Sequence, residues 1–290
     1  MQRATSKELD AIIENDIFFN ILDHGLIRVI DYMGNDQSIV DAARISYGKG
    51  TESKSDDKGL INYLMRHHHT SPFEMCEIKL YIKCPIFVAR QWIRHRTASV
   101  NEYSARYSEV KNEVYIPKPE HIRGQHSSNK QMSNDPTSNQ VAVGFIKDLE
   151  NGSESQYNNY TDALDSGISR ETARIGLPLN TYTEFVWKID LHNLLHFLRL
   201  RMDLHAQYEI IVYADAIAGI VKAWCPLAYA AFEEYRLNSL TFSSKEMEIV
   251  KAMADEYNLL SELGDEDRQF HKLSKGEWRE FIDKIGINNE

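Results

Sequence analysis

Three arginines and a histidine lie close together between Arg94 and Tyr107, in the sequence RHRTASVNEYSARY. The same segment carries hydroxyl side chains, an amide and one carboxylate, and it has almost no material for a hydrophobic core. A guanidinium presents a rigid fork of donors that matches phosphate oxygens. The segment therefore indicates a binding site for an anionic ligand. On composition alone, a solvated, charge-rich loop is an equally good interpretation.

The charge of the whole chain favours a local anion site. The 290 residues include 33 Lys and Arg against 43 Asp and Glu, which gives a net charge of −10 with neutral histidine. Affinity for nucleic acid depends mostly on neutralising phosphates, so an acidic chain is a poor general nucleic-acid binder. An anionic small molecule would need a basic pocket instead.

Histidines and cysteines give no clear metal site. The histidines at 67–69 are consecutive, and consecutive residues of a helix point in different directions, so they cannot all bind one ion. His192 and His196 have the i, i+4 spacing that can hold zinc, but Asn193 stands where an HExxH motif has glutamate. Three cysteines without a zinc spacing favour a reducing cytosol. We expect no metal and a cytoplasmic location.

No segment has the features of a leader or a membrane span. Residues 1–10 carry charge and no apolar core of a signal peptide. The most apolar stretch, 210–224, is interrupted by Asp215 and Lys222 and falls short of the about 18 apolar residues that a span requires. We expect no membrane association.

Alternating residues predict an antiparallel sheet. From Phe73 to Cys84 apolar and polar side chains alternate, which predicts a strand with one buried and one wet face. Residues 24–33 predict the first strand of the chain, and residues 181–188 predict another. Strands and helices mix without a regular βαβ order, so we expect an α+β fold with helices flanking the sheet.

Helical patterns surround these strands. Asp36 is the expected N-cap of a short helix, and a second helix should run from about Asp57 to the histidine run at 67–69. Pro85 ends a strand and can begin a third helix. Asp190 can cap one long helix that continues from residue 191 to about residue 224.

The middle of the chain is more polar. Residues 117–140 have the composition of a long loop, which in a compact domain is usually functional or disordered. A helix should resume near Gln156, and Ser169 can cap a further helix that carries Arg174 and stops at Pro178.

Several motifs, taken in order, resemble one family. The segment 94–107 fits the pattern RHRxxSxNExSxRY, which resembles the signature of flavin-dependent thymidylate synthases. AARISY at 42–47, HTSPFE at 69–74 and ARIGLP at 173–178 resemble other segments of that family. The segment 190–201, DLHNLLHFLRLR, with HAQ at 205–207, resembles its last active-site helix. The resemblance covers roughly residues 25–236.

This resemblance implies a reaction and its cofactors. The family methylates deoxyuridine monophosphate (dUMP) to dTMP with 5,10-methylenetetrahydrofolate as the one-carbon donor. FAD and NADPH supply the reducing equivalents, and no enzyme nucleophile attacks the uracil. The chain has no GxGxxG motif, so the flavin is not expected in a Rossmann crevice. The family also implies a homotetramer whose active sites are built from several chains.

The resemblance further implies roles for individual residues. Arg201 is the catalytic candidate, because a guanidinium beside the uracil N3–C4 edge favours the anionic ring and makes C5 more nucleophilic. Ser104 has no general base beside it in the sequence and is assigned to nucleotide binding. The residues expected to line the nucleotide are Gln91, Arg94, Glu102, Ser104, Ala105, Arg106, Arg174 and Arg201. The flavin contacts are expected to be Ser71, Arg94, His95, Arg96, Thr97, Glu102, Asp190, His192 and His196, with His69 near the folate and the flavin ring.

Helix geometry adds an expectation about subunits. His196 and Arg201 point roughly 140° apart on a helix, because each residue turns by about 100°. We therefore expect them not to line one wall of a single pocket. A helix with functional residues on two sides fits a site shared between subunits.

Three positions depart from the family pattern. Met75 stands where a second histidine commonly follows PFE. Asp190 and His192 occupy the places of an Asn-x-Arg pair, which alters the polarity around the flavin.

The competing interpretation is a nucleic-acid-binding module. Arg94, Arg96 and Arg106, with Tyr103 and Tyr107, could hold a single strand by phosphate contacts and stacking. The acidity of the chain and the shortness of its basic cluster argue against it. A flavin absorbance spectrum distinguishes the two, since only the enzyme should be yellow.

Residues 237–290 have no counterpart in the resemblance and are expected to form a helical extension of a catalytic domain at 1–236. Ser243 with Glu246, and Ser274 with Glu277, are two capping boxes that predict helices. The second helix should end at Gly286. The expected packing residues are Met247, Val250, Tyr257, Trp278, Phe281 and Ile285.

Overall fold

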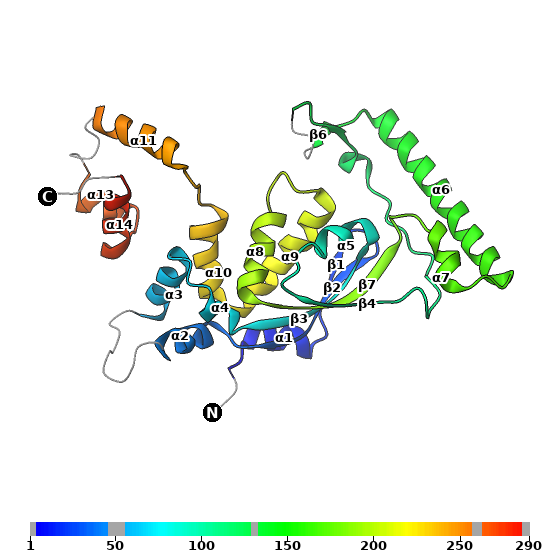
Figure 1. Ribbon diagram of the computed structural model, residues 1–290, viewed down its shortest axis with the longest axis horizontal. Coiled ribbons are helices and arrows are strands. Elements are labelled where there is room, and N and C mark those ends of the chain that lie inside the picture. The colour runs from blue at the N-terminus through cyan, green and yellow to red at the C-terminus, as the bar shows by residue number, and fades with distance from the viewer. Residues whose placement is uncertain (1–3, 46–55, 129–132, 257–262, 286–290) are drawn as a thin grey trace. The chain divides into compact units, whose positions relative to one another are not determined.

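A five-stranded antiparallel sheet forms the centre of the larger part of the chain (Figure 1). The confirmed fold class is α+β, with helices flanking this sheet. The strands, in their order across the sheet, are β1 (Phe18–Ile21), β2 (Gly25–Met33), β3 (Glu77–Pro85), β7 (Tyr182–Asp190) and β4 (Ser99–Glu102).

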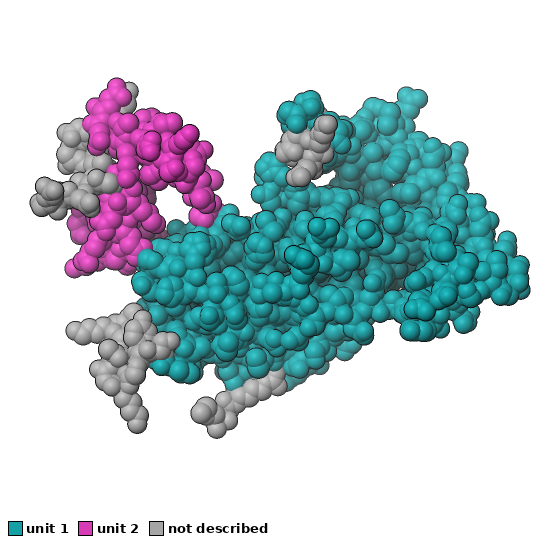
Figure 2. Space-filling view, viewed as in Figure 1, with its two compact units in different colours: residues 1–237 teal, residues 238–290 magenta. Residues whose placement is uncertain are grey.

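The computed structural model describes residues 4–45, 56–128, 133–256 and 263–285. The chain divides into two compact units, Met1–Leu237 and Asn238–Glu290, and each makes most of its contacts within itself (Figure 2). Along the described ranges, no helix is long and apolar enough to cross a membrane.

Two strand predictions need correction. Residues 24–33 do not form the first strand, because β1 precedes β2 in a hairpin that pairs Ile21 with Gly25. The strand predicted from Phe73 begins only at Glu77, since Ser71–Glu74 is the short helix α4 with proline in its first turn. The alternation also fails at Lys83, which is buried and paired with Glu113 at 2.7 Å.

Ten helices are described in the first unit, and several of them cover the sheet. Three of them, α5, α8 and α9, lie along one of its faces (Figure 1). In chain order the helices are α1 (Lys7–Glu14), α2 (Asp36–Ile45), α3 (Asp57–Arg66), α4 (Ser71–Glu74), α5 (Ile86–Trp92), α6 (Asn139–Asp165), α7 (Arg170–Ala173), α8 (Leu191–Arg201), α9 (Tyr208–Trp224) and α10 (Pro226–Phe232).

Aromatic rings join α5 to the sheet and to α8. The fully buried Trp92, the last residue of α5, has ring centroids 5.3 Å from Trp187 of β7 and 5.0 Å from Phe197 of α8. Tyr213 of α9 lies 5.7 Å away. Burial of one large apolar side chain stabilises a fold by about 1.5–3 kcal/mol. This cluster therefore fixes the end of α5 against the C-terminal half of α8.

Asp36 caps a different helix from the one predicted. Its carboxylate accepts hydrogen bonds from the backbone N–H groups of Leu227 and Ala228, both at 2.9 Å, and so caps the first turn of α10. Asn35 instead caps α2, because its Oδ1 accepts from the N–H of Ser38 at 3.2 Å. Burial raises the pKa of Asp36, and the two α10 hydrogen bonds oppose that rise.

The helix predicted from 191 to 224 is two helices. Asp190 is the confirmed N-cap of α8, accepting from Asn193 N at 2.9 Å. The helix ends at Arg201, and α9 starts at Tyr208. In the break, Asp203 accepts from the backbone N–H of His205 at 2.7 Å. Such local side-chain bonds compete with helical hydrogen bonds.

The polar middle segment is more regular than predicted. It contains a 3₁₀ turn at Pro119–His121 and a small sheet of β5 (Arg123–Gln125) and β6 (Ser133–Pro136). Helix α6 starts at Asn139, well before the predicted Gln156, despite glycines that lower helix propensity. Ser169 precedes the short α7, and Arg174 lies in the 3₁₀ turn that follows it, Arg174–Gly176.

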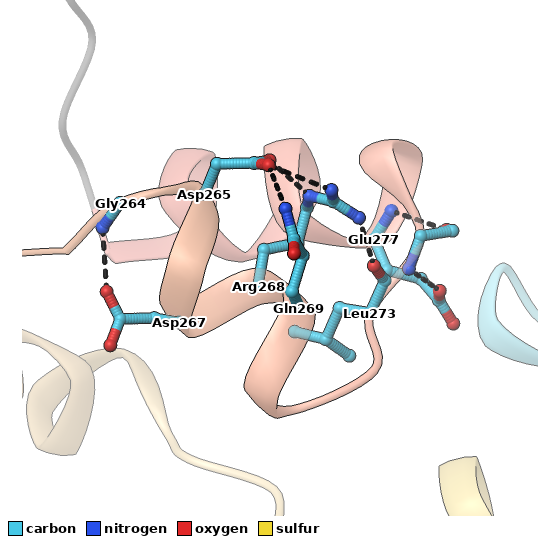
Figure 3. Close-up of polar contacts among 8 residues, drawn as sticks. Gly264, Asp265, Asp267, Arg268, Gln269, Leu273 and Glu277 are labelled. Carbon is cyan, nitrogen blue, oxygen red and sulfur yellow. Dashed lines mark hydrogen bonds and ion pairs between the residues drawn. The ribbon is translucent and has the colours of Figure 1, made fainter.

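The second unit contains three described helices, α11 (Ser244–Glu256), α13 (Asp265–Phe270) and α14 (Lys275–Ile285). Both predicted capping boxes are present, with reciprocal bonds between Ser243 and Glu246 and between Ser274 and Glu277. The unpredicted α13 is held by a fork of bonds from Arg268 to Asp265, at 2.5 and 3.1 Å (Figure 3). Tyr257 and Gly286 lie outside the described residues.

Candidate active site

A cavity of about 600 Å³ opens where the chain leaves α5, facing the last turns of α8. We call it the first cavity. Its volume lies within the about 300–1,000 Å³ typical of small-molecule sites. Four predicted flavin contacts, residues 94–97, lie on its wall together with His196 and Arg201. The full lining is Arg94, His95, Arg96, Thr97, Ile189, Asn193, His196, Leu200 and Arg201.

Arg201 is held in place by two hydrogen bonds. Its Nε donates to Nε2 of His95 at 3.0 Å, and its Nη2 donates to the carbonyl oxygen of Gln91 at 3.3 Å. An Nε2 that accepts a hydrogen bond belongs to a neutral imidazole with its proton on Nδ1. Burial, followed by the positive charge of Arg201 and by His196, lowers the pKa of His95 to about 4. The pair is therefore a fixed guanidinium beside a neutral imidazole at neutral pH.

The prediction that His196 and Arg201 cannot line the same wall is wrong, because both line the first cavity. The angle of about 140° describes the directions of the Cα–Cβ bonds. An arginine side chain is long, and helical side chains lean toward the N-terminus. The guanidinium of Arg201 thus reaches His95 and the cavity. The helix angle no longer argues for a site shared between subunits.

Arg94 and Arg96 are the unpaired cations of the first cavity. Both side chains are exposed, and neither makes a hydrogen bond or ion pair with another residue in the described ranges. Guanidiniums without a carboxylate partner are free to bind phosphate oxygens. They could hold the pyrophosphate of a dinucleotide such as FAD. In the part of the chain that the structure describes, no group of three or more His, Cys, Asp or Glu side chains could hold a metal ion.

A second cavity, of about 260 Å³, lies on the other side of His196, which lines both. It holds two further predicted residues, His69 and His192. Its lining is Leu64, Met65, His68, His69, Thr70, Phe73, His192, Leu195, His196, Arg199, Phe232 and Arg236.

The histidine run directly follows α3, which ends at Arg66, so the predicted helix from Asp57 to this run is confirmed. His68 has a left-handed backbone with φ of 61°. His69 N donates to the carbonyl oxygen of Leu64 at 2.9 Å, and His68 N donates to that of Met65 at 3.4 Å. These two bonds form a Schellman motif, which requires a left-handed residue after the helix. The motif turns His68 and His69 into the second cavity.

The predicted nucleotide residues after β4 lie elsewhere. Arg106 makes two contacts with the carboxylate of Glu171, each at 3.0 Å, and Arg170 pairs with Glu109 at 2.9 Å. These bonds tie the loop that contains Ser104 and Ala105 to α7, directly before the exposed Arg174. The pairs are about half exposed, so each contributes at most about 1 kcal/mol. A phosphate could compete with Glu171 for Arg106.

The predicted nucleotide residues therefore fall into two groups. Gln91, Arg94 and Arg201 surround the end of α5, and Gln91 donates from Nε2 to Gln207 Oε1. The second group lies beside α7, which is well separated from α8 in the first unit (Figure 1). One chain does not gather all of these residues around the first cavity.

Two other predicted contacts, Glu102 and Asp190, have structural partners. Glu102, on the exposed strand β4, accepts from Thr183 Oγ1 at 2.7 Å. Asp190 accepts from the N–H and side-chain amide of Asn193, at 2.9 and 2.7 Å, so its departure from the family pattern provides a helix cap. Ser71 is exposed at the start of α4, and Met75 follows that helix with half of its surface exposed.

Sequence reasoning missed several cavity residues. Asn193 and Leu200 could have been found, since they lie inside the segment already identified from 190 to 201. Nothing in the sequence indicated that Arg236 belongs to a site. Its place in the second cavity depends on a π-helical turn, Glu233–Leu237, which follows α10.

The lowered pKa of His95 predicts a pH dependence of stability. The unfolded chain protonates this imidazole near pH 6.5, whereas the folded chain does so only near pH 4. The unfolded state therefore binds more protons in this window, and the free energy of unfolding should fall as the pH falls from 6.5 to 4. We expect the Tm of His95→Gln, whose amide oxygen can still accept from Arg201, to decline less over that range. A histidine NMR titration of the wild type that places the pKa of His95 above 6 would contradict this expectation.

Known proteins resemble this chain over most of its length. Residues 28–227 match the Thy1 family, described as thymidylate synthase complementing protein. A flavin-dependent thymidylate synthase of Wolbachia pipientis wMel is 53% identical over 281 residues, which are 97% of this chain and 96% of that protein. One from Rickettsia bellii is 51% identical and covers 97% of this chain and 98% of its own.

A solved structure shares the fold. The crystal structure of the UMP/dUMP methylase PolB from Streptomyces cacaoi, bound with 5-Br dUMP, matches with a TM-score of 0.68 and 30% identity. The match covers 77% of this chain and 100% of the PolB chain.

Proposed function

The chain belongs to the Thy1 family of flavin-dependent thymidylate synthases, and on that premise we propose that it methylates dUMP to dTMP with 5,10-methylenetetrahydrofolate as the one-carbon donor. We further propose FAD as the flavin, NADPH as the reductant and the cytoplasm as the location. The observation that carries the proposal is the first cavity, which is lined by the hydrogen-bonded Arg201 and by Arg94 and Arg96, two cations without a partner among the described residues.

The residues of this cavity fit a flavin dinucleotide. Arg94 and Arg96 would bind its phosphates, and Thr97 and Asn193 offer further hydrogen bonds. His192 and His196 would contact the flavin from α8, and His69 from the end of α3. When bound, FAD supplies the hydride chemistry that reduces the transferred carbon.

Arg201 has the geometry for activating the uracil. His95 and the carbonyl of Gln91 hold its Nε and Nη2, which fixes the plane of the guanidinium. The fixed cation would stabilise negative charge on the uracil N3–C4 edge, and so raise the electron density at C5 for attack on the one-carbon unit. A neutral His95 does not compete with Arg201 for that charge.

A site completed by other copies follows from the split between the residue groups. The nucleotide needs both the cluster at α5 and the cluster beside α7, and one chain keeps them apart. In the proposed homotetramer, the loop with Ser104 and Arg106 and the turn with Arg174 reach the first cavity of a neighbouring copy. The shared site is thus inferred from the distance between the two residue groups and not from the angle between His196 and Arg201.

Turnover tests the function directly. Purified protein should form dTMP from dUMP and methylenetetrahydrofolate, and omission of FAD or NADPH should each stop the reaction. The tetrahydrofolate product distinguishes this chemistry from folate-only methylation, in which the folate itself is oxidised to dihydrofolate. Formation of dTMP and dihydrofolate without flavin would overturn the proposal.

Ser104 should bind nucleotide without acting as a nucleophile. In the structure its Oγ accepts from the N–H of Arg106 at 3.4 Å, and no histidine or carboxylate among the described residues hydrogen-bonds to it. We expect Ser104→Ala to raise the KM for dUMP about tenfold, since a hydrogen bond to a charged group contributes about 1.5–3 kcal/mol, and to leave kcat within a few-fold. Ser108→Ala, in the same loop, is the matched control. Loss of turnover at saturating dUMP with binding intact would restore a nucleophilic role.

A further inference from the structure

Two arginines of the second cavity have no role in the proposed site. Arg199 lies on the exposed face of α8, two residues before Arg201, and Arg236 lies in the π-helical turn after α10. Both line the cavity that His196 separates from the first. Neither is among the residues that the family resemblance assigns to flavin or nucleotide.

The second cavity has one apolar wall and a cationic rim. Leu64, Phe73, Leu195 and Phe232 form the apolar wall, whereas the rim consists of imidazoles and the two guanidiniums. Among the residues that the structure describes, no carboxylate lines it. A cavity of about 260 Å³ is slightly below the usual range for whole ligands, about 300–1,000 Å³, so it fits one ring system of a larger molecule.

No described carboxylate neutralises the two guanidiniums of the rim. Arg236 donates to the carbonyl of Met65 at 3.0 Å and contacts the His68 ring at 2.9 Å, neither of which carries a negative charge. Arg199 makes no hydrogen bond or ion pair within the described ranges. Burial, followed by the charge of Arg199, lowers the pKa of Arg236. Mutual repulsion of this kind is relieved when an anion binds between the two groups.

The backbone that carries Arg236 also points to a specific role. A π-helical turn is rare and frequently marks a functional site. Here it directs Arg236 from α10 toward the end of α3, where the left-handed His68 meets it. The cap that Asp36 provides fixes the other end of α10, at Leu227 and Ala228.

We propose that Arg199 and Arg236 form an anion-binding site that holds a carboxylate or phosphate of a co-substrate while one of its rings packs on the apolar wall of the second cavity. This inference rests on the proposed function for the identity of the co-substrates. The same chemistry has two sources there, the glutamate carboxylates of the folate and the phosphates of the nicotinamide dinucleotide.

Binding measurements on the full-length, FAD-loaded protein test the site without turnover. Calorimetry with pteroylmonoglutamate and pteroyltriglutamate compares ligands that share a ring and differ in negative charge. We expect Arg199→Gln to weaken binding of the triglutamate about tenfold and to remove most of its advantage over the monoglutamate. Arg199 makes no bond within the described residues, so this change should leave folding intact.

Further variants separate charge from structure. Arg236→Lys should retain most of the binding and Arg236→Gln should lose it, although both disturb the bond to Met65. Arg28→Gln, which removes an exposed ion pair with Asp16, is the matched control. The Kd for dUMP should not change in any variant.

Kinetic measurements with NADPH identify which co-substrate supplies the anion. A rise in the KM for NADPH with Arg199→Gln, at unchanged folate binding, would support the site and assign it to phosphate. The proposed anion site would be overturned if both Arg199→Gln and Arg236→Gln bound the triglutamate as tightly as the wild type and kept its KM for NADPH. A wild type that forms no dTMP but binds the triglutamate through these arginines would refute the proposed function alone.

Discussion

Replacement of Arg201 by alanine is expected to lower dTMP formation by about a hundred- to a thousand-fold while FAD stays bound. Removal of one preorganised group that stabilises developing charge typically has an effect of this size. The flavin phosphates are assigned to Arg94 and Arg96, whereas the described hydrogen bonds of Arg201 go to His95 and Gln91. The measurement is kcat at saturating substrates, together with the flavin absorbance per protein.

Arg201→Lys is the informative companion variant. Lysine retains the charge but lacks the planar fork that contacts both His95 and the Gln91 carbonyl. We expect activity well below the wild type, since orientation and charge are both required. The pKa of His95 should rise in the alanine variant, because the charge of Arg201 contributes to lowering it. Full activity of Arg201→Ala would remove this residue from the mechanism, and loss of FAD would make it a cofactor ligand.

The parts of the fold that sequence could predict are those set by local patterns. Alternation located β3, and a run rich in β-branched and aromatic residues located β7. Paired Ser and Glu residues located the starts of α11 and α14. The cap at Asp190 was equally predictable, since its carboxylate accepts a hydrogen bond from Asn193 in the first turn of the same helix. In these cases the partner of each group lies within a few residues of it.

The features that sequence could not predict depend on distant partners. Asp36 has the right type for an N-cap, yet it caps α10, whose first turn is 191 residues away along the chain. Lys83 breaks its strand pattern because the partly exposed Glu113 supplies a counter-charge at 2.7 Å. The end of α8 escaped prediction because the side chain of Asp203 competes for the backbone. Tertiary context outweighs local propensity at each of these positions.

The candidate site follows the same rule. The motif from Arg94 to Arg96 and the residues His196 and Arg201 do meet at one cavity. The angle between His196 and Arg201 on an ideal helix predicted that they do not share a cavity wall. The prediction failed because the arginine side chain is long enough to reach that wall. Arg199 lies in the segment already identified, but its proximity to Arg236 became visible only in the structure, because α8 and the π-helical turn are far apart in sequence.

Removal of residues 238–290 is expected to lower the Tm by at least about 4 °C or to change the oligomer size, with activity per folded site largely retained. A loss of roughly 1–2 kcal/mol corresponds to such a shift in a chain of this size. The cut follows Leu237, which closes the π-helical turn of Arg236.

The contacts within the second unit explain why it should depend on another surface. Ala254 is its one buried apolar residue among those described, whereas Ile249, Met253 and Phe270 are 61%, 53% and 81% exposed. The predicted packing residues Trp278 and Phe281 pack on each other, with ring centroids 5.6 Å apart. Helices of this length are marginal in water without an apolar face to pack against. We therefore propose a structural appendage that packs on the catalytic unit or on a neighbouring copy.

Point variants distinguish packing from chemistry in this segment. Phe281→Asp should reproduce the lower Tm or altered oligomer size of the truncation, whereas Arg279→Ala, on the exposed surface of the same helix, should not. Size-exclusion chromatography with light scattering and thermal melts measure both effects, and dTMP formation per bound flavin measures the site. A truncated protein that melts and assembles like the full chain but forms no dTMP would refute the structural role and move residues 238–290 into the active site.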